Sequence, residues 1–252
     1  MIIDGKKESA LLREEIKKEI FEIKKKTNKS PSLSVILIGD FAPSQIYVKN
    51  KEKNSKEVGI NSEIIRYSKE VKESKILEKI DELNNNDNVS GILVQLPLPA
   101  HISKEKIINA IKPSKDVDGF HPINVGNLSS GYKAIVPCTP SGCLLLIKKV
   151  EKNLTGKHAV IIGRSNLNGK PMAQLLLKED CTVSIVHSKT NDLKSECQKA
   201  DILVVAVGVA NLVKEDWVKK DSIIIDVGTN KVADKIVGDV DFEKVKDKVK
   251  AI

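Results

Sequence analysis

Short apolar runs alternate along the chain with longer stretches in which apolar residues recur every three or four positions. The short runs are typical of buried strands, and the periodic stretches are typical of amphipathic helices. Because strands and helices alternate, the pattern predicts βαβ units with parallel sheets covered on both faces. The expected strands are 33–38, 63–67, 91–96, 159–162, 182–186, 202–207 and 222–227, and the expected helices are 8–28, 44–58, 71–85, 103–111, 141–150, 170–178 and 193–199.

One segment, 112–140, interrupts this rhythm. It is rich in Pro, Gly, Asp and Asn, so we expect loops between two domains there. The strands and helices after it have the order and length of a Rossmann-type domain. The sequence therefore predicts an α/β protein of two α/β domains flanking a cleft, with boundaries at 1–136 and 137–252.

Composition narrows the function classes. The net charge is +8, but lysines alternate with acidic residues, as in Lys17-Lys18-Glu19, and aromatic residues make up only 3% of the chain. That pattern indicates solvated helix faces, so we expect no nucleic-acid partner. The sequence has neither a secretory signal nor an apolar run long enough for a membrane span. Four cysteines without Cys-x-x-Cys spacing predict a reduced, cytoplasmic protein without a metal site.

The most informative stretch is the turn Gly163-Arg-Ser-Asn-Leu-Asn-Gly169, which follows an apolar run and precedes a helical pattern. A strand that turns on glycine into a helix N-terminus exposes backbone N–H groups to a phosphate. Arg164 is one of only three arginines in the chain, and its planar guanidinium suits a phosphate. A purely structural glycine turn remains the alternative.

The next expected strand favours one dinucleotide. In an NAD site an acidic residue at its end binds the ribose 2′-hydroxyl, but here 182–186 runs into His187-Ser188-Lys189. Hydroxyl and cationic groups opposite Arg164 suit a 2′-phosphate, so NADP is preferred over NAD. We interpret His187 as a ligand-side or packing residue rather than a catalytic one.

Candidate chemistry in the first half comes from three places. Tyr47 and Lys51 are four residues apart and share a helix face. A lysine partly removed from water can exchange protons near neutral pH, although a surface Tyr–Lys pair is the alternative. Gln95 is the one polar residue of its strand, which ends where α/β proteins bind ligands. The carboxylates of Lys115-Asp-Val-Asp118 either cap turns, or one of them grips the edge of a heterocycle by paired hydrogen bonds.

Together these motifs resemble the bifunctional methylenetetrahydrofolate dehydrogenase/methenyltetrahydrofolate cyclohydrolase family. The resemblance is collinear from about residue 4 to residue 240. The motifs that carry it are Ser44-Gln-Ile-Tyr47-Val-x-x-Lys51, Gly91-Ile-Leu-Val-Gln-Leu-Pro-Leu-Pro99, Lys115-Asp-Val-Asp-Gly-Phe-His-Pro122, Pro137-Cys-Thr-Pro140, Gly163-Arg-Ser165, Ile225-Asp-Val-Gly228 and Gly238-Asp-Val240.

The resemblance implies oxidation of 5,10-methylenetetrahydrofolate by NADP, followed by hydrolysis of the methenyl product to 10-formyltetrahydrofolate. Lys51 would be the acid/base of the hydrolysis, Tyr47 would orient the folate ring, and Gln95 would hydrogen-bond Lys51. Asp118 would hold the pterin edge. Arg164, Ser165 and Ser188 would take the 2′-phosphate beside Gly163, and Thr229 would lie near the nicotinamide. A homodimer through the cofactor domains is also implied.

The chain differs from the family pattern in two places. Asn168 replaces the usual valine before the second glycine of the turn, which predicts a modest effect on packing or cofactor contacts. The sequence also stops at Ile252, before the family's Pro-Gly-Gly-Val-Gly-Pro loop and final helix, and we expect that segment to be omitted rather than missing from the protein. A monofunctional enzyme on the same scaffold and a non-catalytic binding remnant are the alternatives.

Overall fold

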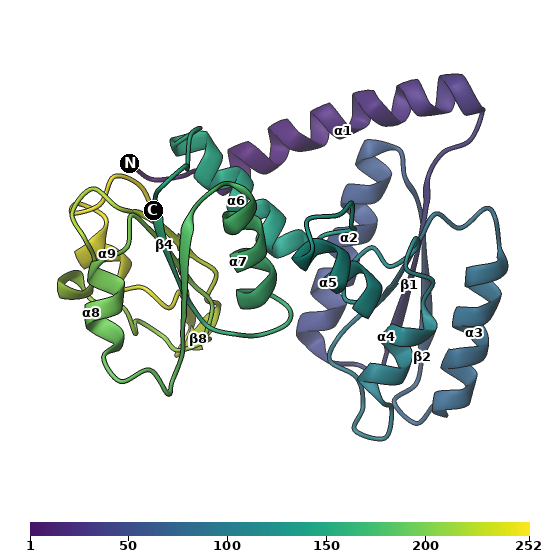
Figure 1. Cartoon of the computed structure of the whole chain (residues 1–252). Helices are drawn as coiled ribbons and strands as arrows, with labels where there is room; N and C mark the ends of the chain where they lie inside the picture. Colours follow the sequence, from purple (N-terminus) through teal and green to yellow (C-terminus); the bar gives the residue numbers. More distant parts are fainter. The chain divides into compact units, whose positions relative to one another are not determined.

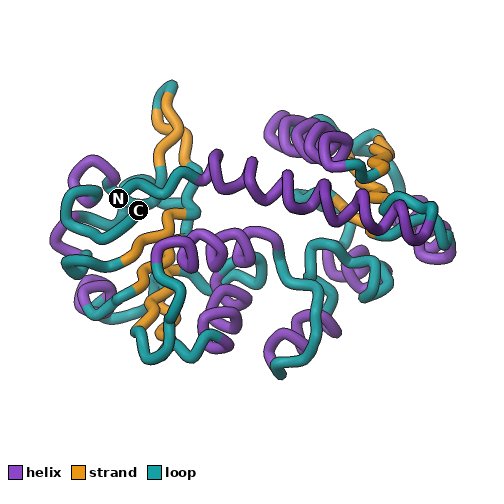
Figure 2. The backbone as a smooth tube through the Cα atoms, turned by 90° about the horizontal axis from the view of Figure 1, so that it is seen from above, coloured by secondary structure: helices purple, strands orange, loops and turns teal.

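The computed structural model describes residues 1–252, and the chain divides into two compact units. One unit is Lys6–Gly126, and the other joins Met1–Gly5 to Asn127–Ile252. The first residues belong with the last because the N–H of Ile3 donates to the carbonyl oxygen of Ile252, and the N–H of Ile252 donates to that of Met1. Figure 1 shows the helices and strands of both units, and Figure 2 shows their strands as separate sheets.

The unit Lys6–Gly126 is built on a parallel sheet of order β2-β1-β3. Alternate residues of β1 serve two cores: Ile36 and Ile38 pack with α3 and α4, whereas Val35 and Leu37 pack with Val48 of α2. Its elements are α1 (Gly5–Thr27), β1 (Ser32–Ile38), α2 (Ala42–Val58), β2 (Asn61–Tyr67), α3 (Glu73–Asn85), β3 (Gly91–Val94), α4 (Lys104–Ala110) and the start of α5 (Pro122–Ser129).

The helix α2, which carries candidate chemistry, has clear start and stop signals. Pro43 lies in its first turn, where a missing N–H costs nothing. Gly59 ends it in the left-handed conformation, with φ of 91°, and its N–H donates to the carbonyl oxygen of Lys56. These signals fix where the polar side chains of α2 stand above the sheet.

The second unit is built on a parallel sheet of order β5-β4-β6-β7. Helices α6 and α7 cover one face through Ile147, Met172 and Leu176, and Cys197 of α8 packs on the other. Its elements are α6 (Cys138–Val150), β4 (His158–Ile162), α7 (Gly169–Lys178), β5 (Thr182–Val186), α8 (Leu193–Gln198), β6 (Ile202–Val205), the 3₁₀ turn Glu215–Trp217, β7 (Ile223–Asp226), β8 (Asn230–Val232), β9 (Lys235–Val237) and α9 (Phe242–Val245).

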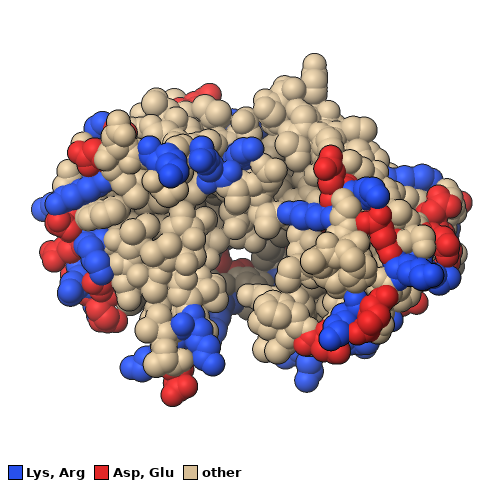
Figure 3. All heavy atoms as spheres, turned by 90° about the horizontal axis from the view of Figure 1, so that it is seen from below, with Lys and Arg blue, Asp and Glu red and all other residues tan.

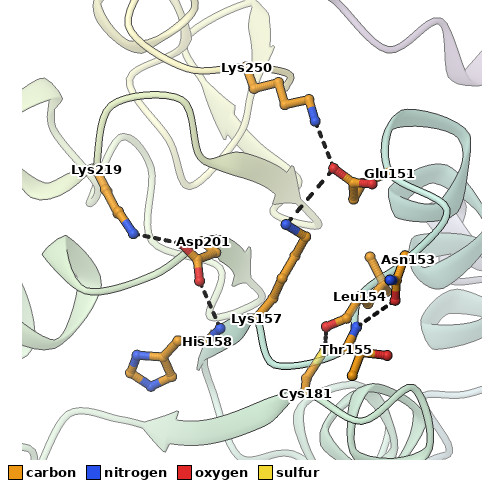
Figure 4. Close-up of polar contacts among 10 residues, drawn as sticks. All are labelled: Glu151, Asn153, Leu154, Thr155, Lys157, His158, Cys181, Asp201, Lys219 and Lys250. Carbon is orange, nitrogen blue, oxygen red and sulfur yellow. Dashed lines mark hydrogen bonds and ion pairs between the residues drawn. The ribbon is translucent and has the colours of Figure 1, made fainter.

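The amino ends of β4 and β6 are tied together by polar contacts (Figure 4). Asp201 accepts from the N–H of His158 at 2.9 Å and from Nζ of Lys219 at 2.6 Å. Burial opposes ionisation of Asp201, but these two hydrogen bonds outweigh it and lower its pKa. Glu151 pairs with both Lys157 and Lys250. The polar side chains at the amino edge of the sheet therefore stabilise the fold, and the carboxyl edge is where a ligand is expected.

The predicted α/β class with parallel sheets is confirmed, and the main differences lie outside the strands. The segment 112–140 is not all loop, because α5 forms within it and begins at Pro122. The antiparallel hairpin of β8 and β9 was also not predicted, since its short, exposed strands lack an apolar run. The compact units divide at Gly126, while the predicted functional boundary between 136 and 137 stays a prediction.

Surface charge is mixed. On the face drawn in Figure 3, Lys and Arg side chains lie among Asp and Glu side chains. Several lysines pair with carboxylates three or four residues away on their own helix, such as Lys56 with Glu52 and Lys79 with Glu82. No helix is long and apolar enough to cross a membrane.

Candidate functional site

Lys51 and Gln95 meet in the unit Lys6–Gly126, although 43 residues separate them in the sequence. Nζ of Lys51, on α2, donates to Oε1 of Gln95 at 2.9 Å. Gln95 follows directly after β3, and its amide nitrogen donates to the carbonyl oxygen of Leu96 at 2.8 Å. The glutamine therefore uses both ends of its amide, which fixes its oxygen toward the lysine. The structure brings these two predicted residues together.

Asp118 lies near the same lysine. Burial raises the pKa of Asp118, the positive charge of Lys51 opposes that rise, and the negative charge of Asp116 adds to it. Asp118 also lines a small pocket with Asp116, Lys104, Leu96, Phe120 and isoleucines from β3 and from α4 and its end. A carboxyl group among mainly apolar side chains, with the cations Lys51 and Lys104 nearby, can accept hydrogen bonds from a ligand that carries N–H groups.

Asp116 has the turn-capping use that the sequence allows for the carboxylates of this segment. It is buried, and its Oδ2 accepts from the N–H of His121 at 2.8 Å and from the amide of Asn124 at 3.0 Å. These contacts hold the loop that carries Asp118 against the start of α5.

Tyr47 lies one turn before Lys51 on α2, and 54% of its surface is exposed. An exposed tyrosine ring on the same helix as Lys51, four residues before it, is available to a ligand. Ser44, one turn earlier on α2, is buried, and its hydroxyl donates to the carbonyl oxygen of Leu96 at 3.4 Å. The start of α2 is thereby anchored to the segment after β3.

The glycine turn between β4 and α7 in the second unit leaves no space for side chains at its two glycines. A Cβ on Gly163, whose φ is 120°, would lie 2.6 Å from the carbonyl oxygen of Ala206. A Cβ on Gly169 would lie 2.0 Å from the carbonyl oxygen of Gly163. None of the chain's hydrogen bonds uses the backbone N–H groups of Arg164 and Ser165. The turn thus has the close packing and available donors that a dinucleotide phosphate needs.

Arg164 extends toward the end of β5. Its Nη1 lies 3.2 Å from Nε2 of His187, which places the guanidinium beside the turn that contains Ser188. That turn is fixed because the N–H of His187 donates to the hydroxyl of Thr190 at 2.9 Å. Ser188 is exposed there, and Ser165 accepts from the N–H of Asn168 at 3.1 Å. Cationic and hydroxyl groups therefore converge at the carboxyl ends of β4 and β5.

Thr229 lies beyond the end of β7, apart from these residues but at the same edge of the sheet. Asn168 lines a small pocket with Thr139, Cys143 and Met172. Its carbonyl oxygen accepts from the N–H of Met172 at 2.9 Å, and α7 still packs its apolar residues into the core. A polar residue at this position is thus compatible with the packing of α7.

Two family profiles match the chain. Residues 3–118 match the profile described as the tetrahydrofolate dehydrogenase/cyclohydrolase catalytic domain. Residues 137–252 match the NAD(P)-binding domain of the same family. The chain belongs to this family. The profile of the catalytic domain covers Lys51, Gln95 and Asp118, and that of the NAD(P)-binding domain covers the glycine turn.

Similar proteins agree with this assignment. The "Bifunctional protein FolD" of Pelagibacter ubique is 65% identical over 252 residues, which are 100% of this chain and 90% of the relative. The crystal structure of the bifunctional FolD dehydrogenase/cyclohydrolase from Campylobacter jejuni superposes with a TM-score of 0.97 at 47% identity, covering 100% of this chain and 90% of that one. The enzyme of Trypanosoma brucei, solved with NADP and an inhibitor, has a TM-score of 0.94 at 34% identity, with coverages of 100% and 89%.

These comparisons confirm the predicted family, the α/β fold class, the enzyme class and NADP as the cofactor. At the level of the family they also confirm the activity, which is oxidation of 5,10-methylenetetrahydrofolate followed by hydrolysis of the methenyl product. The roles of the individual residues remain predictions.

Proposed function

We propose that Lys51 transfers the protons of the hydrolytic step and that Gln95 holds it in place. The observation that carries this proposal is the 2.9 Å hydrogen bond from Lys51 Nζ to Gln95 Oε1, with Asp118 close by in the same unit. Water adds to the carbon of the methenyl cation and loses one proton, which gives a neutral carbinol. The bond from that carbon to N5 then breaks as the carbinol hydroxyl loses its proton to form the formyl C=O and N5 gains a proton, so one proton is released overall. Lys51 takes and returns the protons that move.

Asp118 and Tyr47 bind the folate in this proposal. The ionised carboxylate of Asp118 accepts hydrogen bonds from the amino group and ring N–H of the pterin, a paired arrangement that fixes orientation. Tyr47 is exposed on the same helix as Lys51 and lies against the ring. Support comes from the small, mainly apolar pocket that Asp118 lines together with Phe120 and Leu96.

The second unit is proposed to hold NADP on the turn from Gly163 to Gly169. Neither glycine has room for a Cβ, so a pyrophosphate can approach the backbone closely there. The backbone N–H groups of Arg164 and Ser165 are unused and can donate to it. Arg164, Ser165 and Ser188 hold the 2′-phosphate, and Thr229 lies at the nicotinamide end. When bound, the cofactor accepts the hydride of the oxidation, for which the chain supplies orientation rather than an acid or base.

Paired assays test the two activities. Purified protein is given 5,10-methylenetetrahydrofolate with NADP or NAD, and NADPH or NADH formation is recorded. Separately, the methenyl compound is supplied without cofactor, and its disappearance is recorded against a protein-free control. We expect both reactions, with NADP used in preference to NAD. A protein that performs only one of them would be monofunctional, and the proposal would be wrong.

Homodimerisation through the NADP-binding unit is also part of the proposal. The hairpin of β8 and β9 exposes apolar side chains, with Val232 49% and Ile236 69% exposed, which suits a second copy of the chain. Replacing Ile236 by Glu should lower the molar mass measured by light scattering to that of a monomer. An unchanged mass would exclude the hairpin from the interface.

We further propose a cytoplasmic location and a functional boundary between residues 136 and 137. Support for the location comes from the cysteines Cys138, Cys143, Cys181 and Cys197, none of which forms a disulfide. Support for the boundary comes from the NAD(P)-binding profile, which begins at residue 137, just before α6. Fractionated cells and limited proteolysis test these two statements.

A further inference from the structure

Two carboxylates lie beneath the carboxyl ends of β6 and β7. Asp226 is the last residue of β7, and Asp239 follows β9 and is fully buried, with 0% of its surface exposed. Oδ1 of Asp226 accepts from the backbone N–H of Asp239 at 2.9 Å, so the two residues are joined directly. Neither carboxylate has a role in the reactions described above.

Every hydrogen bond to these two carboxylates comes from an N–H donor. Asp226 also accepts from the N–H groups of Gly228 at 2.9 Å and Val240 at 3.0 Å. A protonated oxygen in this position would need an acceptor, and it would meet only N–H groups. Burial raises the pKa of Asp226, while these N–H groups oppose the rise. We take the carboxylate of Asp226 as ionised at neutral pH because its donors satisfy only the ionised form.

Asp239 is held in the same way. Its Oδ2 accepts from the N–H groups of Val207 at 2.8 Å and Gly208 at 2.9 Å, just after β6. Its Oδ1 accepts from the amide of Asn230 at 2.8 Å. The partners of Asp239 are neutral amides, so no cation cancels its charge at these contacts.

Gly228 and Gly238 pack directly against the carboxylates of Asp226 and Asp239. A Cβ on Gly238 would lie 1.8 Å from Oδ2 of Asp226, and a Cβ on Gly228 would lie 2.3 Å from the carboxyl group of Asp239. The two side chains are therefore fixed in position by the backbone around them. Their charges cannot move far when a ligand binds at this edge.

The order of strands places this pair relative to the cofactor. The sheet runs β5-β4-β6-β7, and the proposed phosphate ligands lie at the ends of β4 and β5. A dinucleotide that crosses the carboxyl edge from there has its other base at the ends of β6 and β7. The N–H groups of Val207, Gly208 and Gly228 are already used by carboxylates, so they are not available to a phosphate.

We propose that Asp226 and Asp239 supply a fixed negative charge at the nicotinamide end and make this enzyme bind oxidised NADP more tightly than NADPH. The oxidised nicotinamide ring carries a positive charge, and the reduced ring is neutral, so a buried carboxylate discriminates between them. The two aspartates act on the ring through space and are positioning residues. This inference rests on the proposed location of the cofactor.

The test is the ratio of two dissociation constants, measured by titration calorimetry without folate. In the unaltered protein, NADP should bind more tightly than NADPH. Asp239→Asn should reduce that preference several-fold, because one of the two negative charges near the ring is lost. The amide can keep its oxygen toward Val207 and Gly208, so only the hydrogen bond with Asn230 has to rearrange.

Asp221→Asn is the matched control, because Asp221 is exposed near the opposite end of β7 and has a φ of 61°, which asparagine tolerates. It should leave the ratio unchanged. Equal weakening of both ligands by Asp239→Asn, or an unchanged ratio, would mean that the pair is only structural. If that variant does not fold, tighter binding of NADPH than NADP by the unaltered protein would itself overturn the inference. Adenosine 2′,5′-bisphosphate, which lacks nicotinamide, tests the proposed cofactor site separately from the effect of the two aspartates. If the unaltered protein does not bind it, the proposed NADP site is wrong; if it binds, the NADP-to-NADPH ratio tests Asp226 and Asp239 alone.

Discussion

Replacing Lys51 by Met tests the assignment of the hydrolytic step. Lys51 donates the 2.9 Å hydrogen bond to Gln95 and is half-buried on α2. Methionine keeps most of the side-chain length but can neither accept nor donate the protons of the reaction. General acid–base catalysis contributes about 10²–10⁴-fold to a rate, so we expect hydrolysis of the methenyl compound to fall by that factor. This is a rise of about 2.7–5.4 kcal/mol in the activation free energy.

The folded protein should survive this change. The variant loses one hydrogen bond, with a net cost of about 0.5–1.5 kcal/mol in the free energy of unfolding. NADP affinity should be unchanged, because the residues proposed to hold the cofactor lie in the other compact unit. Folate affinity should become more sensitive to acid, since the charge of Lys51 opposes the raised pKa of Asp118 and is absent from the variant.

The assay records loss of the methenyl absorbance in a stopped-flow spectrophotometer, at several pH values, beside urea unfolding of each protein. Lys53→Met is the matched control: Lys53 is exposed on the same helix, and the same substitution there should leave hydrolysis within about twofold of the unaltered rate. If folded Lys51→Met protein hydrolyses the methenyl compound at more than about a tenth of the normal rate, the acid/base role of Lys51 is refuted.

Three further outcomes follow from particular contacts. Because burial raises the pKa of Asp118, its carboxylate is lost at higher pH than that of an exposed aspartate, so affinity for a folate analogue should fall early on acidification; Asp118→Asn should remove this dependence, and an identical pH profile would contradict it. Gly169→Ala should abolish NADP binding in a calorimetric titration, since its Cβ would lie 2.0 Å from the carbonyl oxygen of Gly163; normal affinity would show that the turn has another use. Asp201→Ala should lower the free energy of unfolding in urea by about 1–2 kcal/mol at neutral pH. The pKa of Asp201 is lowered in the folded protein, so this difference should disappear as the pH falls through the lowered value, and a constant difference would refute the reasoning.

The strands of both sheets could be predicted because a buried parallel strand needs a continuous apolar run, as in 33–38 and 159–162. Helix α5 could not be predicted because its sequence, Pro122 to Ser129, contains residues that are typical of loops. Part of its support is tertiary: Asp116 accepts from the buried side chain of Asn124. Local composition contains no information about such a contact.

The candidate site was predicted one residue at a time. Gln95 could be singled out because a lone polar residue in an apolar run needs a partner, and Lys51 because of its helix face. Their contact depends on the packing of α2 near the end of β3, which periodicity does not specify. The contact between Asp226 and Asp239 could not be predicted for a related reason. The hairpin of β8 and β9 brings the two residues together, and its short strands lack the apolar run that would have indicated them.

The central claim is that the two activities depend on different residues of one chain, and two variants assayed for both reactions test it most directly. Lys51→Met should lose hydrolysis of the methenyl compound and keep its NADP affinity. Arg164→Ala should keep hydrolysis and weaken NADP about 10-fold to 100-fold while NAD binding changes much less, since one charge-assisted contact with the 2′-phosphate is lost. If Arg164→Ala weakened NADP and NAD equally, or if both variants lost hydrolysis together, the account would be contradicted.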